Sequence, residues 1–151
     1  MLRFNGGGQF NLPVGNVDFN KNVVRALNDY FSFVRKQNIV FSSKDFRKFF
    51  AERKFLRNDF VYIDPPYLIT ASEYNKIWDE RSEESLRDVL DNLTGKGVKF
   101  AMSNLTHYRG EKNDSLIRWM RRYHVHPIKS NYINYHDNRQ KSIKEVLITN
   151  Y

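Results

Sequence analysis

An apolar run that ends in an acid, two prolines and a tyrosine is the feature that most constrains the fold of this chain. Phe60–Ile63 contains only apolar and aromatic residues, and Asp64, Pro65, Pro66 and Tyr67 follow it directly. A short apolar run bounded by such turn residues is typical of a buried strand. A strand of this kind would deliver Asp64 to the carboxyl edge of a parallel sheet, where open α/β folds bind their ligands.

The turn after this run can hold an amino group that is attached to a flat ring. Proline fixes its own φ and has no N–H, so the turn is stiff and its carbonyls remain available as acceptors. Asp64 and the Pro65 carbonyl can accept both hydrogens of the amine, while Tyr67 covers the ring. Two such acceptors favour a pyramidal nitrogen that can attack a methyl group on a sulfonium. A Pro-Pro turn with a packed tyrosine also occurs in proteins that methylate nothing, so the four residues alone leave both interpretations open.

The rest of the chain alternates between helical and strand periodicity. We expect helices over residues 18–36, from residue 42 onwards, over 82–93 and over 114–123, and strands over residues 38–41, 60–63, 98–103, 124–129 and 145–149. Asp18 would cap the first helix, whose apolar stripe we expect to face the core. Ser42 would cap the second helix, in which Phe46 and Phe50 share one face. The alternation favours an α/β fold with a mostly parallel sheet that is covered on both faces.

With these segments in place, the chain resembles the DNA adenine-N6 methyltransferases of the D12 class, and in particular the branch that methylates GATC sites. The part that follows the family's target-recognition hairpin resembles Arg3–Asn5 and Gln9–Gly15. The family's catalytic tetrad resembles Asp64–Tyr67, and its active-site loop resembles Leu68–Thr70 and Tyr74-Asn75. The end of its next strand resembles Ser103-Asn104. Their order is the family's order, which makes chance similarity a poor explanation.

The resemblance implies a Rossmann-like methyltransferase sheet with an antiparallel C-terminal hairpin, and S-adenosylmethionine as the cofactor. The catalytic residues that it implies are Asp64, Pro65, Pro66 and Tyr67. The cofactor-binding residues are Asp45, Phe46 and Asp64, and the DNA-binding residues are Arg3, Tyr74, Asn138 and Arg139. Each assignment has an ordinary alternative: Asp45 is also a good residue for a helix start, Arg3 a solvated arginine, and Tyr74 a packing residue of its loop.

One family feature is missing from this sequence. Members of this branch begin with a cofactor segment that contains a Phe-x-Gly-x-Gly turn, and nothing like it precedes Asp64. Gly6-Gly7-Gly8 follows no strand, so it is a flexible turn and not a phosphate cradle. We therefore expect a partial fold, with residues 1–17 as the remnant of a target-recognition region and residues 18–151 as the catalytic region of a carboxyl-terminal portion.

Composition sets broad limits on partners and location. The 151 residues carry 25 Lys plus Arg against 17 Asp plus Glu, a net charge of +8 that suits a polyanion without proving one. The absence of cysteine excludes disulfides and thiolate metal sites and fits a cytoplasmic protein. The apolar runs are too short for a membrane span. The four histidines have no metal-binding spacing, so we expect no metal.

These observations predict a DNA methyltransferase that acts on N6 of adenine. The adenine must leave the duplex, since its amino group cannot meet the sulfonium inside the stack. The expected partners are double-stranded DNA with a flipped adenine and a separate chain that supplies the cofactor segment. We expect this chain alone to bind the cofactor weakly or not at all. Two alternatives remain: a truncated remnant that folds without catalysing, and a methyltransferase that acts on an RNA amino group.

Overall fold

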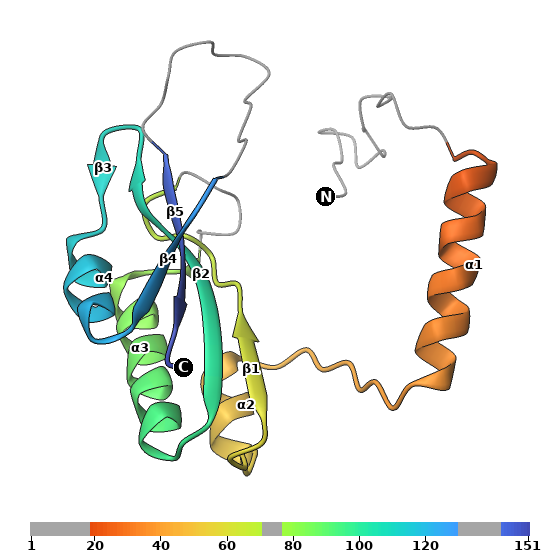
Figure 1. The fold of residues 1–151 in the computed structure, drawn as a ribbon, viewed down its shortest axis with the longest axis horizontal. Coiled ribbons are helices and arrows are strands. Elements are labelled where there is room, and N and C mark those ends of the chain that lie inside the picture. Colours follow the sequence, from red (N-terminus) through yellow and green to blue (C-terminus); the bar gives the residue numbers. More distant parts are fainter. Residues whose placement is uncertain (1–18, 71–76, 130–142) are drawn as a thin grey trace. The chain divides into compact units, whose positions relative to one another are not determined.

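The computed structural model describes residues 19–70, 77–129 and 143–151. The chain divides into two compact units, residues 1–43 and 44–151, which are described separately (Figure 1). The predictions for residues 1–17 and for Arg3, Tyr74, Asn138 and Arg139 lie outside the described residues, as does the boundary expected after residue 17.

Helix α1 (Lys21–Lys36) is the one regular element described in the first unit. Its cap is Asn20, and not the Asp18 expected from the sequence, because the Asn20 side chain accepts hydrogen bonds from the backbone N–H groups of Asn22 and Val23 at 2.9 and 3.2 Å. No residue of α1 is buried, and Tyr30 is 51% exposed. Within the first unit no described residue covers the helix, and the expectation that its apolar stripe faces a core stays a prediction.

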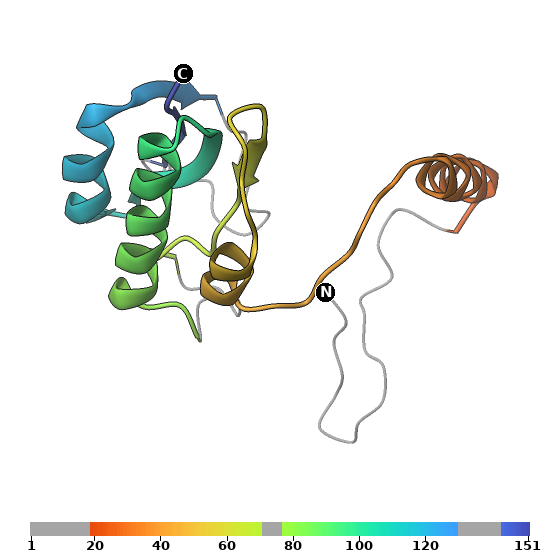
Figure 2. The same cartoon turned by 90° about the horizontal axis from the view of Figure 1, so that it is seen from below.

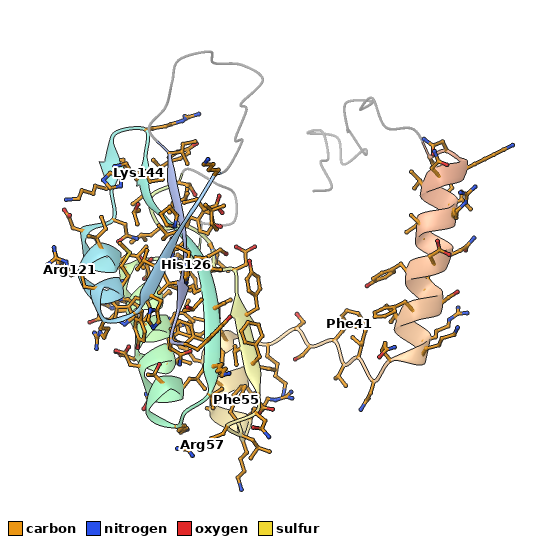
Figure 3. All side chains as sticks on the ribbon, in the orientation of Figure 1. Phe41, Phe55, Arg57, Arg121, His126 and Lys144 are labelled. Atoms are coloured by element: carbon orange, nitrogen blue, oxygen red, sulfur yellow. The ribbon has the colours of Figure 1, made fainter. Side chains whose placement is uncertain are left out.

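The strand expected over residues 38–41 does not form. The backbone there has no regular structure, and the side chains of Val40 and Phe41 are 83% and 74% exposed. In Figure 3 the ring of Phe41 projects from the coil that follows α1. A strand needs a hydrogen-bonded neighbour, and no described residue supplies one.

The second unit contains all the described strands. Its elements in chain order are α2 (Phe46–Glu52), β1 (Phe60–Ile63), α3 (Glu80–Gly95), β2 (Lys99–Tyr108), β3 (Glu111–Lys112), α4 (Asp114–Trp119), the 3-10 turn η2 (Met120–Arg122), β4 (His124–Ile128) and β5 (Lys144–Thr149). The four strands and the two helices expected after residue 59 are confirmed, with ends that differ by up to about five residues. The cap expected at Ser42 is wrong: Asp45 caps α2, because its carboxylate accepts the N–H of Arg47 at 2.9 Å.

The sheet is mixed, with the order β1-β2-β5-β4 and β3 paired to β2. β1 pairs with β2 in parallel, whereas β5 pairs antiparallel with both β2 and β4. β1, β2 and β4 thus share one direction, but the insertion of β5 leaves β1–β2 as the one parallel pair in the part of the sheet that the structure describes. The expected C-terminal antiparallel hairpin is confirmed, and the mostly parallel pairing is not.

In the part of the second unit that the structure describes, helices cover one face of this sheet, and not both faces as expected. Figure 2 shows α2, α3 and α4 in one layer beside the strands. Two helical connections step across the sheet in the same direction. One runs from β1 through α3 to β2, and the other runs from β2 through α4 to β4. Right-handed crossovers that step the same way place their helices on the same face.

The core lies between that helical layer and the sheet. Leu90 of α3, Phe100 of β2, Leu116 of α4 and Ile148 of β5 have no exposed surface. On the strand ladder, Phe100 and Met102 stand beside Val61 and Ile63, so the inner face of β1 continues this core. The unit therefore builds its main apolar cluster from residues 86–148.

A buried carboxylate joins three of these elements. Glu83 of α3 is 2% exposed, and Asn113 Nδ2 donates to its two oxygens at 3.0 and 3.2 Å, while Asn104 Nδ2 donates to Oε1 at 3.2 Å. Arg87 lies 3.9 Å away on the same helix. Burial raises the pKa of the Glu83 carboxyl above its ordinary value, although the Asn113 hydrogen bonds and the Arg87 charge oppose this shift.

None of the helices that the structure describes combines the length and the apolar character that crossing a membrane requires.

Candidate active site

Asp64 lies at the carboxyl end of β1, where the sequence predicted it. Its carboxylate is exposed, whereas Pro65 behind it is buried. Ser103 Oγ of the neighbouring strand donates to Asp64 Oδ1 at 2.8 Å and lies 3.4 Å from the Ile63 carbonyl. The carboxylate is therefore held in place on one oxygen, and among the described residues no donor contacts its second oxygen, Oδ2.

Tyr67 turns back toward the same carboxylate. Its hydroxyl lies 3.3 Å from Asp64 Oδ1, and its backbone carbonyl accepts the N–H of Thr70 at 3.0 Å. The acid and the phenol, three residues apart across the two prolines, are thus close enough to contact one ring. Neither of them points into the hydrophobic interior, since Asp64 is exposed and Tyr67 is half-buried.

A cleft of about 570 Å³ lies beside this turn. Its predicted lining residues are Asp45, Phe46, Asp64, Pro65 and Pro66. The structure therefore brings the cofactor-binding candidates and three of the four catalytic candidates to one cleft. The remaining lining is mostly apolar and comes from α2, the inner face of β1 and the start of α3. A mostly apolar cleft with a few fixed polar groups is typical of a small-molecule site.

Asp45 is both the cap of α2 and a lining residue of the cleft, so the two roles weighed for it are compatible. One carboxylate oxygen accepts the Arg47 N–H at 2.9 Å, and the other lies 3.3 Å from Arg47 Nη1. The Arg47 guanidinium also lies 4.5 Å from the centre of the Phe46 ring. These contacts fix an acceptor next to an aromatic face, an arrangement that suits a purine with an amino group.

The comparisons with known proteins agree with this geometry. The family model of the D12 class N6 adenine-specific DNA methyltransferases matches residues 1–134. The chain belongs to this family. It is 36% identical over 160 residues to the Type II methyltransferase M.FokI of Planomicrobium okeanokoites, and 35% identical over 161 residues to the modification methylase StsI of Streptococcus sanguinis. Each match covers 99% of this chain.

The chain is short beside these relatives. It spans 24% of the length of M.FokI and of StsI, and 53% of the Type II methyltransferase M1.LlaDCHI of Lactococcus lactis subsp. cremoris, to which it is 29% identical over 159 residues. Within the D12 family the chain therefore matches one part of the length of these relatives.

Sequence reasoning missed several residues of this D12 site. Ile77 and Trp78 line the cleft, and the Trp78 ring packs 5.6 Å from that of Phe46. Ser103 was noted as a strand end but not as a partner of Asp64. Glu145, which lies 3.3 Å from the Tyr67 hydroxyl, carried no sequence signal because it comes from β5, 78 residues further along the chain. A register between strands that are distant in sequence was needed to find it.

The described residues offer no metal site: no three His, Asp or Glu side chains among them are grouped closely enough to hold an ion. His126 illustrates this. It lies on β4, as Figure 3 shows, and its ring nitrogen Nε2 faces the Thr149 hydroxyl at 3.5 Å.

Proposed function

We propose that this chain is the catalytic portion of a DNA methyltransferase that transfers a methyl group from S-adenosylmethionine to N6 of adenine. The observation that carries the proposal is the cleft in which Asp64 and Pro65 meet Asp45 and Phe46. Membership of the D12 family supports it. The sheet is then the carboxyl-terminal part of a Rossmann-like methyltransferase sheet.

The donor set of the cleft fits the adenosine end of this cofactor. Asp45 can accept from its amino group, and Phe46 can stack on its purine. When bound, S-adenosylmethionine supplies an electrophilic methyl group on a positively charged sulfur. With the cofactor in place, the aromatic and apolar lining would exclude water from that part of the cleft, which would strengthen the electrostatic interactions made by Asp64.

The chain's own groups then act on the target base. Ser103 fixes Asp64 Oδ1, which leaves Oδ2 to accept one hydrogen of the adenine amine, and the Pro65 carbonyl accepts the other. Tyr67 covers the face of the base, which must be flipped out of double-stranded DNA to reach this turn. Asp64 or water takes up the proton that the methylated nitrogen releases.

We further propose that polypeptide beyond these 151 residues completes the cofactor side. β1 is the terminal strand of its sheet and is apolar on both faces, with Phe60 and Tyr62 55% and 61% exposed on the outer one. Edge strands are usually protected by charge or proline, and β1 has neither. An added strand at this edge would cover it.

A methylation assay tests the proposal. The chain is incubated with labelled S-adenosylmethionine and GATC-containing DNA, alone and together with the polypeptide encoded by the adjoining reading frame. We expect weak or absent transfer by the chain alone and transfer to adenine N6 in the mixture. Asp64→Ala should abolish it. Asp88→Ala, the same change at an exposed position of α3, is the matched control and should not.

The two alternatives have distinct outcomes in the same assay. Transfer to an RNA substrate but not to the DNA would identify an RNA amino-methyltransferase. Folding and DNA binding without transfer under any condition would identify a non-catalytic remnant. Full activity of Asp64→Ala would remove the mechanism.

A further inference from the structure

Glu145 brings a second carboxylate to the catalytic turn. It lies on β5, half-buried, and its strand neighbours are Leu105 of β2 and Ile128 of β4. Because Leu105 and Ser103 alternate onto the same face of β2, the Glu145 side chain stands on the face from which Ser103 reaches Asp64. Glu145 is thus part of the surroundings of Asp64 although 81 positions separate them in the sequence.

The Tyr67 hydroxyl lies between the two carboxylates. Its oxygen is 3.3 Å from Asp64 Oδ1 and 3.3 Å from Glu145 Oε1. Both distances exceed the roughly 2.7 Å typical of an O–H···O hydrogen bond, so each of these two carboxylates holds the hydroxyl only in a long hydrogen bond. A phenol has one proton to donate, and each carboxylate competes for it.

This competition matters because Asp64 Oδ1 already accepts the Ser103 hydroxyl at 2.8 Å. A second donor on the same carboxylate would withdraw more electron density and make Asp64 a poorer acceptor for the amine of a substrate. When the Tyr67 hydroxyl is drawn toward Glu145, Asp64 keeps its ability to accept a hydrogen bond from the amine.

We infer that Glu145 is a positioning residue for methyl transfer: it draws the Tyr67 hydroxyl away from Asp64 and so keeps the Asp64 carboxylate available to the target amine. The inference rests on the proposed function for its consequence in catalysis. Its structural part stands independently, because it concerns one hydroxyl and two acceptors within the chain.

A double-mutant cycle in the methylating mixture tests the catalytic part. Glu145→Leu removes the acceptor, and we expect kcat to fall roughly tenfold with little change in KM, a size typical of one charge-assisted hydrogen bond. In a Tyr67→Phe background the same substitution should have no further effect, because no hydroxyl is left to position. Glu111→Leu, an exposed change on β3, is the control and should leave kcat unchanged.

Equal losses from Glu145→Leu in both backgrounds would overturn the inference, since a merely structural role of Glu145 does not depend on the Tyr67 hydroxyl. Unchanged kcat in Glu145→Leu would overturn it too. Absence of transfer by the wild-type mixture would instead count against the proposed function.

A crystal structure of the Glu145→Leu chain gives a readout without activity. We expect the distance between Tyr67 Oη and Asp64 Oδ1 to shorten from 3.3 Å to about 2.7 Å as the hydroxyl turns toward Asp64. A distance that stays at 3.3 Å or lengthens would show that Glu145 does not compete for this proton.

Discussion

The hydroxyl of Ser103 lies 2.8 Å from Oδ1 of Asp64, and this hydrogen bond ties the end of β1 to the middle of β2. Ser103 is 5% exposed, so the bond is shielded from competing water. The orientation of the Asp64 carboxylate is therefore set by the neighbouring strand as much as by the two prolines that follow it.

Ser103→Ala should lower kcat about tenfold while KM for DNA changes little, because the lost bond orients Asp64 without contacting DNA. Steady-state methylation kinetics of the complemented chain measure both constants. Ser103→Thr keeps the hydroxyl and is the matched variant. A threonine variant as impaired as the alanine variant would indicate that packing, and not the hydrogen bond, matters at this position.

Phe46→Ala should weaken the binding of S-adenosylmethionine by roughly five- to tenfold, because it removes the aromatic face at the cleft. Calorimetry on the complemented chain measures the change in Kd. Phe41→Ala makes the same change at a phenylalanine outside the cleft lining and should leave Kd within about twofold. Equal effects of the two substitutions would remove Phe46 from the cofactor site.

Phe60→Lys should weaken association with the complementing polypeptide at least about tenfold, since a charge on an edge strand opposes strand addition. The melting temperature of the chain alone should hardly change, because Phe60 is 55% exposed. Sedimentation of the mixture measures the association. Phe31→Lys, at an exposed phenylalanine of α1, is the comparison. Undiminished association of the Phe60 variant would exclude β1 as the docking edge.

Glu83 should make the stability of the chain depend on pH. Its folded pKa lies above its unfolded value, so its contribution is fully present below about pH 4.5 and is lost as the pH rises through the folded pKa. The free energy of unfolding of the wild type should therefore fall relative to that of Glu83→Gln as the pH rises above about 4.5. Denaturant titrations across this range measure the difference. A constant or rising difference contradicts the prediction.

Local sequence rules succeeded where one segment decides the outcome. The apolar run 60–63 formed a strand, and the turn after it placed Asp64 and Pro65 at a cleft because prolines restrict the backbone whatever surrounds them. The same reasoning found Phe46 through its helical spacing. Family order, and not periodicity, supplied the pairing of that residue with Asp45 as a cofactor site.

The same rules failed where a distant partner decides. Residues 38–41 have the composition of a strand but no described neighbour with which to pair, so they form none. Periodicity does not encode the order of strands in a sheet. It therefore could not predict that β5 runs antiparallel between β2 and β4, or that Glu145 contacts Tyr67 as a result. Asp45 and Ser42 are both good capping residues, and tertiary packing of α2 chose between them.

The fully buried side chains Leu90, Phe100 and Ile148 all belong to the unit that begins at Lys44. Every buried residue of the described core cluster, from Leu86 to Ile148, is therefore supplied by this unit itself. A gene interrupted upstream of α2 would still encode all of these buried core residues. Cutting the coding sequence at that point leaves this interior and the described lining of the cleft, from Asp45 to Leu86, in one polypeptide.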